Sequence, residues 1–344
     1  MHAYTDRKSK MAQNNPISPN LPCKVRLLIS ILTTVIDATR RSNGTVNRRL
    51  MSLFDFKASP SDKPNNAVKT SDVMVDPSRN LWFRLYVPTT TDPASKLPLV
   101  IYFHGGGFVF FSANSKPYND LCKRLATKLP AVIISVNYRH APEHRYPSQY
   151  EDGMDVLKFI DTTRIEGLDL NNVDITRCFL AGDSAGGNLA HHVVIKTSDH
   201  EFCQMRVMGL IAIQPFFGGK ERTESETRLA KEGLAITLEQ TDWYWKAFLP
   251  EGSNRDHAVV NVFGPESSGI LGVKFPATIV FMGGFDPLQD WQKMYYQGLK
   301  KKGIQAYLIE YPNSFHGFYV FPELKESSFF IKEVKDFIDK LSTC

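Results

Sequence analysis

The stretch that decides the fold is residues 182–187, Gly-Asp-Ser-Ala-Gly-Gly. It follows a short apolar run at residues 178–181 and opens a helix-like segment with the sequence NLAHHVVIK. A Gly-x-Ser-x-Gly motif between a strand and a helix is typical of a nucleophile elbow, in which the serine occupies a sharp, strained turn. The residues two before and two after the serine must be glycines, because side chains there would crowd the turn. The motif therefore predicts Ser184 as a nucleophile, and the following helix directs its positive end at developing negative charge.

Strand-like segments lie on both sides of this motif, and helical segments separate most of them. The first two are expected to form a hairpin, whereas the later ones are continuous apolar runs that favour parallel strands covered on both faces. The predicted strands are residues 71–75, 81–87, 99–103, 131–136, 178–181, 208–213, 278–282 and 306–311. The predicted helices are residues 117–128, 149–162, 184–197, 288–303 and 327–341. The fold class is therefore α/β, with a mostly parallel eight-stranded sheet between two layers of helices.

One stretch breaks the alternation of strands and helices. Residues 216–275 are too long for a single crossover and include an aromatic cluster with helix-like spacing. We expect inserted cap helices here, which together with residues 20–55 would cover a pocket at the carboxyl ends of the strands, where open α/β sheets bind ligands. The expected organisation is an N-terminal extension and cap helix at 1–56, a polar linker loop at 57–70, and the α/β domain at 71–344.

The composition is that of a globular protein. The 344 residues are 42% hydrophobic and 22% charged, which excludes disordered, collagen-like and coiled-coil classes. Five scattered cysteines without a Cys-x-x-Cys pair favour free thiols in a reducing compartment. The net charge of +5 comes from residues 1–50, which hold nine Lys and Arg against two Asp. The rest of the chain is near neutral, which argues against a nucleic-acid enzyme.

The basic N-terminal segment contains an apolar stripe at helical spacing. Residues 25, 28, 29, 32 and 36 predict an amphipathic helix, either docked on the body of the protein or lying on a membrane surface. We expect no secretory signal and no stable membrane insertion, because the apolar run is too short to span a bilayer. An organelle transit peptide within residues 1–50 and a start at Met11 stay open. The expected location is cytoplasmic, with a nuclear location also compatible.

A second motif, His-Gly-Gly-Gly-Phe at residues 104–108, directly follows a predicted strand. Consecutive glycines leave backbone N–H groups free to converge on the oxyanion of a tetrahedral acyl intermediate. We expect donors at Gly105 and Gly106, joined by the N–H of Ala185 after the nucleophile. His104 is expected to brace the loop through hydrogen bonds, with a role as base as the alternative. A phosphate-binding loop is not favoured, because no Lys-Ser/Thr pair follows the glycines.

A serine nucleophile needs a base and an acid, and after a nucleophile elbow these follow in the chain order Asp/Glu, then His. His316 lies just past the last predicted strand, and Asp286 just past the preceding one. Asp286 would orient the imidazole and stabilise its cation. Asp290 is the competing candidate, whose simpler role is an acidic residue in the first turn of a helix. The remaining histidines near these motifs, His140, His144, His191 and His192, are expected to be structural. No metal or cofactor is expected, since no residues show metal-ligand spacing.

These motifs together resemble a known family. The two glycine motifs and residues 138–147 (YRHAPEHRYP) are similar to the hormone-sensitive-lipase branch of the α/β-hydrolases. Residues 42–48 (SNGTVNR), 242–250 (DWYWKAFLP) and 284–291 (GFDPLQDW) resemble the plant carboxylesterases, which are relatives of the gibberellin receptor. The resemblance covers residues 20–340.

The resemblance implies an α/β-hydrolase fold with a catalytic triad at the matching positions Ser184, Asp286 and His316. It also implies an oxyanion loop that begins at His104 and a structural role for residues 138–147. Similarity to the receptor implies that residues of the cap helix and of the segment after the triad histidine face the ligand. The expected substrate-pocket residues are Gly107, Phe108, Asp183, Tyr244, Gly317 and Tyr319.

The resemblance leaves more than one function open and favours one of them. Receptor-like relatives lack the triad histidine and have serine in place of the third glycine of the oxyanion loop, whereas this chain has His316 and Gly107. We therefore expect a serine carboxylesterase that hydrolyses small carboxylic esters through an acyl-enzyme on Ser184. The alternatives are a catalytically silent small-molecule receptor and a non-hydrolytic enzyme of specialised metabolism. The expected partner is a small-molecule ester with an apolar portion, with no nucleic acid and no obligate protein partner.

Overall fold

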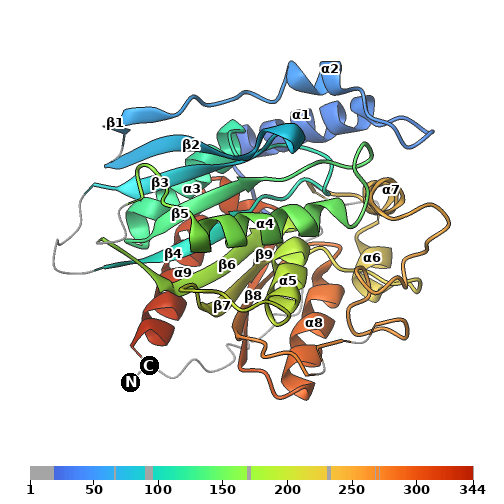
Figure 1. The fold of residues 1–344 in the computed structure, drawn as a ribbon. Helices are drawn as coiled ribbons and strands as arrows, with labels where there is room; N and C mark the ends of the chain where they lie inside the picture. The colour runs from blue at the N-terminus through green and yellow to red at the C-terminus, as the bar shows by residue number, and fades with distance from the viewer. Residues whose placement is uncertain are drawn as a thin grey trace.

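A single nine-stranded sheet runs through the part of the protein that the computed structural model describes, residues 19–65, 67–89, 96–168, 172–230, 234–267, 269, 270 and 272–343 (Figure 1). The strands are β1 (Ser61–Asn65), β2 (Val68–Asp76), β3 (Leu81–Pro88), β4 (Leu97–Phe103), β5 (Val132–Asn137), β6 (Val173–Asp183), β7 (Val207–Ile213), β8 (Ala277–Phe285) and β9 (Ala306–Phe315). Their spatial order is β1-β2-β3-β5-β4-β6-β7-β8-β9. The strands from β5 to β9 in this order are parallel, and β1, β2 and β3 form an antiparallel edge.

Helices cover both faces of the sheet. They are α1 (Cys23–Thr39), α2 (Arg48–Ser52), α3 (Lys116–Lys128), α4 (Ser148–Thr162), α5 (Ala185–Thr197), α6 (Glu224–Arg228), α7 (Leu238–Phe248), α8 (Gln289–Lys301) and α9 (Lys325–Ser342), with 3-10 turns η1 (Pro77–Arg79) and η2 (Phe318–Val320). Successive side chains of a strand point to opposite faces, and both faces of β4 are buried. Ile101 and Phe103 join the core formed with α4, α5 and α8, whereas Val100 and Tyr102 join the core formed with α3 and α9.

The predicted α/β class with a mostly parallel sheet is confirmed, but the predicted number of eight strands is wrong. The additional strand, β1, lies within the predicted linker loop at 57–70 and pairs antiparallel with β2 through Ser61 and Thr70. The search for apolar runs misses β1 because it is a polar edge strand, the place where a proline such as Pro64 is tolerated. The proposed division of the chain into extension, linker and α/β domain otherwise stays a prediction.

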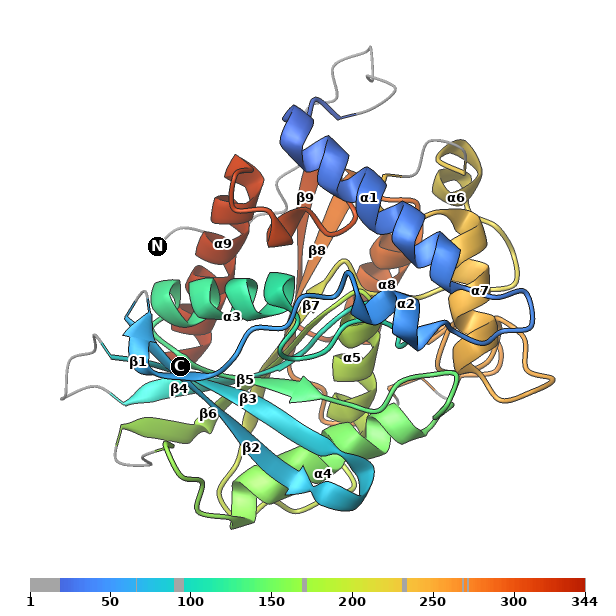
Figure 2. The same ribbon diagram turned by 90° about the horizontal axis from the view of Figure 1, so that it is seen from above.

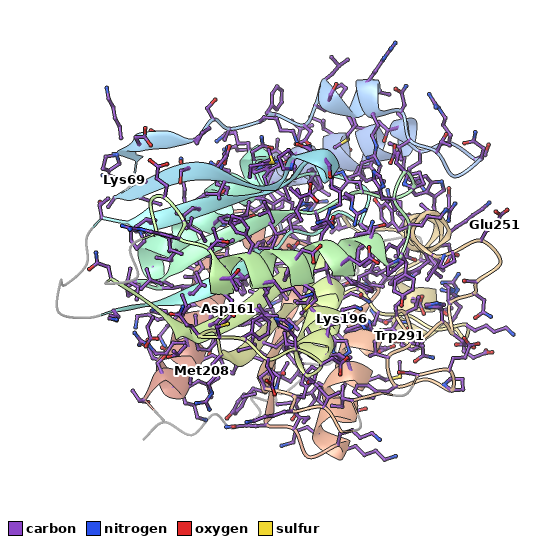
Figure 3. The ribbon with its side chains drawn as sticks, viewed as in Figure 1. Lys69, Asp161, Lys196, Met208, Glu251 and Trp291 are labelled. Carbon is purple, nitrogen blue, oxygen red and sulfur yellow. The ribbon has the colours of Figure 1, made fainter. Side chains whose placement is uncertain are left out.

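Long-range polar contacts fix the loops between the layers. Asp161, at the end of α4, accepts backbone hydrogen bonds from Cys203, Gln204 and Met205 in the loop before β7. Figure 3 shows Asp161 on the side of the sheet covered by α4 and α5. Because three consecutive N–H groups converge on one carboxylate, this loop is tied to α4 rather than free.

The N-terminal amphipathic helix is docked on the body of the protein. Val25, Ile29 and Ile36 of α1 are buried, while Leu28 from the predicted inner face is 44% exposed. Its ends are tied by ion pairing of Lys24 with Glu323 and by the Gln240 amide, which donates to Asp37 at 2.8 Å. Figure 2 shows α1 reaching from α9 to the cap helix α7. None of the described helices is both long enough and apolar enough to cross a membrane.

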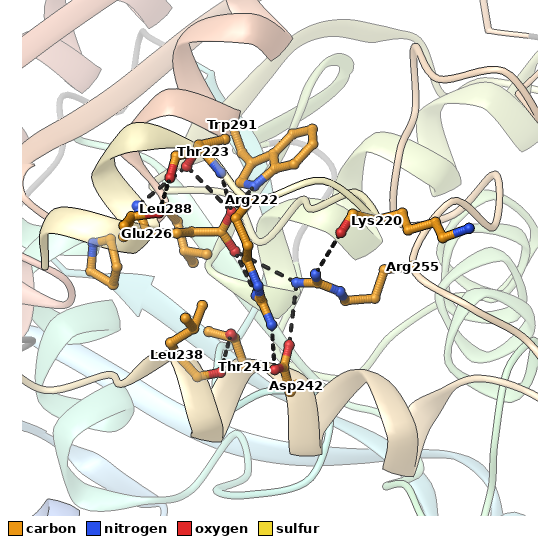
Figure 4. A network of polar contacts seen from close by, with 12 residues as sticks. Lys220, Arg222, Thr223, Glu226, Leu238, Thr241, Asp242, Arg255, Leu288 and Trp291 are labelled. Atoms are coloured by element: carbon orange, nitrogen blue, oxygen red, sulfur yellow. Dashed lines mark hydrogen bonds and ion pairs between the residues drawn. The ribbon is translucent and has the colours of Figure 1, made fainter. Parts of the chain in front are cut away.

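Residues 216–275 contain the helices α6 and α7 at the positions predicted for the cap, and a charge network around the buried Glu226 connects these helices to α8 (Figure 4). Glu226, which is 2% exposed, accepts hydrogen bonds from Arg222 at 3.0 Å and from the indole of Trp291 at 2.9 Å. Arg222 also pairs with Asp242 on α7, which Arg255 reaches at 3.2 Å. A buried carboxylate is costly without such partners, so the network couples both cap helices to the sheet domain.

The burial of α9 yields a stability prediction with an internal control. Phe337 is fully buried against Phe179 of β6, whereas Phe329 on the same helix is 54% exposed. We expect Phe337→Ala to lower the free energy of unfolding by about 3–5 kcal/mol, because it leaves a cavity in the core. Phe329→Ala should change it by less than about 0.5 kcal/mol. Urea unfolding of both variants checks this, and equal losses would contradict the assigned packing.

Candidate active site

Ser184 occupies the strained turn that the glycine motif predicts. Its φ of 52° and ψ of −119° lie in a region that residues with side chains rarely adopt. A Cβ added at Gly182 would lie 2.1 Å from the carbonyl oxygen of Gly186, and one added at Gly186 would lie 1.9 Å from that of Phe103. Neither position can hold a side chain, so the glycines allow β4, β6 and α5 to meet at the serine.

The structure brings Ser184, His316 and Asp286 together in a chain of hydrogen bonds. Ser184 Oγ lies 2.9 Å from His316 Nε2, and His316 Nδ1 lies 2.7 Å from Asp286 Oδ2. Because a carboxylate only accepts, Nδ1 carries the imidazole proton and Nε2 faces the serine hydroxyl as an acceptor. The three residues follow β6, β9 and β8, so they share the carboxyl edge of the sheet.

The electrostatic surroundings of His316 suit a base. Burial disfavours its charged form, but the charge of Asp286, the hydrogen bond to it and the charge of Asp183 outweigh burial. The net effect raises the pKa of His316 above its ordinary value. A higher pKa strengthens the imidazole as a proton acceptor as long as it remains neutral at the working pH.

Asp286 is fully buried, and its carboxylate is satisfied from several elements. Oδ1 accepts the backbone N–H of Leu288 at 2.9 Å. Oδ2 accepts His316, the Gln214 amide at 3.1 Å and the Gln292 amide at 2.8 Å. Sequence reasoning missed both glutamines. Gln214 directly follows β7, so the rule that functional side chains gather at carboxyl strand ends could have found it. Gln292 lies within α8 and carries no such signal.

The competing acid, Asp290, is placed elsewhere. Its Oδ2 accepts the backbone N–H of Ser225 at the start of α6, at 2.8 Å. Asp290 therefore joins the cap to α8, while Asp286 contacts the imidazole.

One expectation for the oxyanion loop is wrong. The backbone N–H of Gly105 donates to Asp183 Oδ1 at 2.8 Å, so it is engaged within the protein rather than free for an oxyanion. Within the described chain, the N–H groups of Gly106, Gly107 and Ala185 donate to no protein acceptor. The motif predicts where the glycines lie, but it does not show that the N–H of Gly105 is engaged, because its acceptor Asp183 lies 78 residues further along the chain.

Asp183 is the centre of a buried tyrosine cluster. Its carboxylate accepts hydrogen bonds from Tyr102 at 2.7 Å, Tyr118 at 2.9 Å and Tyr319 at 2.7 Å, in addition to Gly105. Burial raises the pKa of Asp183, and the tyrosine hydrogen bonds only partly oppose this. The polar ends of Asp183 and Tyr319, two of the expected pocket residues, therefore face each other. Sequence reasoning missed the roles of Tyr102 and Tyr118.

His104 braces the loop that carries the glycines. Its Nδ1 lies 2.8 Å from the carbonyl oxygen of Gly105, and its ring stacks on Tyr138 with centroids 4.4 Å apart. Burial lowers the pKa of His104 to about 3, so the ring is neutral. Arg48 from the N-terminal extension donates to the carbonyl oxygen of Val109 just beyond the glycines. Of the other histidines, His191 contacts the Tyr295 hydroxyl, and His192 contacts the Val259 carbonyl.

Of the remaining expected pocket residues, Gly107, Phe108 and Tyr244 belong to the glycine loop or contact it, whereas Gly317 contacts Gln214. A Cβ on Gly107 would approach the ring of Tyr244 to 2.5 Å, so this glycine makes room for the cap tyrosine. Phe108 is fully buried and stacks on Phe248 of α7 with centroids 3.9 Å apart, which places it in the cap core. Gly317 has a φ of 87°, and its N–H donates to the side-chain oxygen of Gln214.

The described residues contain no cluster of His, Cys, Asp or Glu that could hold a metal ion.

The contact between Gly107 and Tyr244 predicts a specific clash. We expect Gly107→Ala to cost about 1–3 kcal/mol of stability, because the new methyl group overlaps the ring. Gly252→Ala is the matched control, since Gly252 also has a positive φ of 84° but open space around its Cβ. Urea unfolding should show a larger loss for Gly107→Ala, and combining it with Tyr244→Ala should be less costly than the two single losses added. Additive losses would contradict the clash.

Known proteins resemble this chain over most of its length. Residues 100–320 match the α/β-hydrolase fold family. The chain is 38% identical to gibberellin receptor GID1C of Arabidopsis thaliana over 331 residues, which covers 93% of this chain and 94% of the receptor. It is 33% identical to carboxylesterase 20 of the same plant over 313 residues, with 88% and 95% covered.

A second plant relative and a solved structure extend the comparison. The 3-O-acetylpapaveroxine carboxylesterase CXE1 of Papaver somniferum is 33% identical over 300 residues, with 83% of this chain and 91% of that protein covered. The hyperthermophilic esterase of Pyrobaculum calidifontis has a TM-score of 0.74 at 25% identity, with 94% of this chain and 99% of that chain covered. The chain therefore belongs to the α/β-hydrolase family, in the branch that contains plant carboxylesterases and gibberellin receptors.

Proposed function

We propose that this protein is a serine carboxylesterase that hydrolyses small carboxylic esters through an acyl-enzyme on Ser184. The observation that carries the proposal is the hydrogen-bonded chain from Ser184 through His316 to Asp286, with distances of 2.9 and 2.7 Å. The named carboxylesterases among its relatives and the esterases among its structural neighbours support the same activity.

The geometry suits two successive acyl transfers. Ser184 Oγ attacks the ester carbonyl carbon while His316 Nε2 takes the hydroxyl proton, and the same proton is then given to the leaving alcohol. In the second half, His316 takes a proton from water, whose oxygen attacks the acyl carbon. His316 then gives this proton to Ser184 Oγ as the bond between Oγ and the acyl carbon breaks, which releases the carboxylic acid. Throughout, Asp286 holds the Nδ1–H tautomer and stabilises the imidazolium.

The oxyanion would be held by backbone donors of the two glycine motifs. We assign Gly106, Gly107 and Ala185 to this role in place of Gly105, because their N–H groups lack protein acceptors in the described chain. One such donor contributes about 3–4 kcal/mol to transition-state stabilisation. Asp183 acts on this loop indirectly, since it holds Gly105 in place.

A receptor function is the second candidate, because the chain is 38% identical to a protein named as a gibberellin receptor. A receptor needs a pocket but no base beside the serine. The contact between His316 and Ser184 therefore favours an enzyme, and turnover separates the two functions. A cytoplasmic location and the lack of an obligate protein partner stay predictions.

Hydrolysis of p-nitrophenyl acetate and butyrate by the purified protein tests the proposed function. Ser184→Ala and His316→Ala should each lower kcat by about 1000-fold or more, because they remove the nucleophile and its base. Both variants should keep the unfolding transition of the wild type. A folded wild type that does not turn over these or other small esters would contradict the enzyme assignment and favour the receptor.

The raised pKa of His316 predicts the pH dependence of kcat/KM. Only the neutral imidazole accepts the serine proton, so activity is lost as the pH falls through this pKa. The midpoint of the acid limb should therefore lie above about 6.5, the ordinary value for histidine. Asp286→Asn should move the midpoint to lower pH and reduce kcat, since it removes the charge that favours the imidazolium. Asp290→Asn is the control, and an equal shift in both variants would contradict the assignment of Asp286.

A further inference from the structure

The side chain of Gln214 makes contacts that the triad mechanism does not use. Gln214 is fully buried, directly follows β7 and has a φ of 42°. This conformation is unfavourable for a residue with a side chain, and a residue before a proline, here Pro215, normally adopts an extended backbone. Its backbone N–H donates to the carbonyl oxygen of Phe281 in β8 at 3.0 Å. Such strain persists where the surroundings impose it, and it gathers at functional sites.

The Gln214 amide contacts the acid Asp286 directly and contacts the backbone next to the base, His316. Nε2 donates to Asp286 Oδ2 at 3.1 Å and to the carbonyl oxygen of Phe315 at 3.2 Å. Oε1 accepts the N–H of Gly317 at 2.8 Å. Since Phe315 and Gly317 are the two chain neighbours of His316, the amide is hydrogen-bonded to the backbone on both sides of the base. The opposite amide orientation would set oxygen against two acceptors and N–H against a donor, so the network fixes the assignment.

We propose that Gln214 is a positioning residue that holds His316 and Asp286 at the separation their hydrogen bond requires. This inference rests on the proposed esterase function. A Cβ at Gly317 would meet nothing within 4 Å, so close packing does not restrain this segment at that point. At Gly283 a Cβ would come within 2.7 Å of Gln214 Nε2, so the glycine leaves the space that the amide occupies.

Gln292 separates this role from simple stabilisation of the acid. It donates to Asp286 Oδ2 at 2.8 Å from α8, but the described hydrogen bonds include none from it to the backbone beside His316. Loss of the Gln292 amide removes one hydrogen-bond donor to the Asp286 carboxylate. Loss of the Gln214 amide removes such a donor and also the two hydrogen bonds that hold the backbone beside His316. A displacement of about 1 Å in a catalytic group can lower the rate about 100-fold.

The test compares Gln214→Met with Gln292→Met and Gln149→Met. Gln149 is a matched control, because it is fully buried and its amide donates to the carbonyl oxygens of Arg139 and His144, away from the triad. We expect Gln214→Met to lower kcat for p-nitrophenyl butyrate about 100-fold with little change in KM. Gln292→Met should lower kcat less, and Gln149→Met should keep kcat close to wild type. A kcat for Gln214→Met as high as that of Gln149→Met would overturn the inference.

Gln214→Glu gives a readout that a merely structural role would not move. A neutral carboxyl donates one O–H and still accepts from Gly317. The variant therefore keeps part of the contacts to Asp286 and to the backbone beside His316 while its carboxyl is protonated. The ratio of its kcat to that of wild type should fall as the pH rises, whereas the ratio for Gln214→Met should stay flat. A flat ratio for Gln214→Glu would overturn the inference. This arm also keeps the test decisive if Gln214→Met does not fold.

A spectroscopic arm separates failure of this inference from failure of the proposed function. His316 Nδ1 lies 2.7 Å from Asp286 Oδ2, and the proton in this short hydrogen bond should give a far-downfield ¹H NMR resonance in wild type and in Ser184→Ala. Gln214→Met should lose or shift this resonance, and Gln149→Met should retain it. A folded wild type without esterase activity would overturn the proposed function alone. An unchanged resonance in Gln214→Met would overturn the positioning role whether or not the protein hydrolyses esters.

Discussion

The buried carboxylate of Asp286 is the interaction on which the candidate site depends. It lies at the end of β8, away from water, and accepts hydrogen bonds from His316, Gln214, Gln292 and the backbone of Leu288. A carboxylate buried without such donors would cost several kcal/mol, so these partners offset the cost of burying Asp286 between β8 and α8. The same contacts that make the charge tolerable also orient the imidazole, which couples folding to chemistry.

A second buried carboxylate plays the corresponding part on the oxyanion side. Asp183 gathers three tyrosine hydroxyls and the N–H of Gly105, so the residue next to the nucleophile fixes the start of the glycine loop. The cap then contacts the same loop through Tyr244, whose ring occupies the space that a side chain at residue 107 would fill. Arg48 of the N-terminal extension adds a hydrogen bond to the carbonyl oxygen of Val109, just beyond the glycines. The loop is thus held from the sheet, the cap and the extension, as a preorganised oxyanion site requires.

The sequence predicts those features that depend on local geometry or on chain order. The glycines around Ser184 are dictated by a turn of a few residues, and the order of serine, acid and base follows from strands that all end at one edge. The features it does not predict join distant parts of the chain. Gly105 and its acceptor Asp183 are 78 residues apart, and Gln214 and Asp286 are 72 residues apart. The edge strand β1 is missed for a related reason, since its pairing with β2 rather than its own apolar pattern makes it a strand.

The central claim is that Ser184 is a nucleophile activated by His316. The most direct measurement is mass spectrometry of the protein after treatment with diethyl p-nitrophenyl phosphate, which loses p-nitrophenolate when an activated serine attacks its phosphorus. The account predicts one diethylphosphoryl group per chain on the peptide that contains Ser184, with loss of esterase activity in step and much slower labelling of His316→Ala. Esterase activity that persists while Ser184 stays unmodified, or a label that settles on another residue, would contradict it.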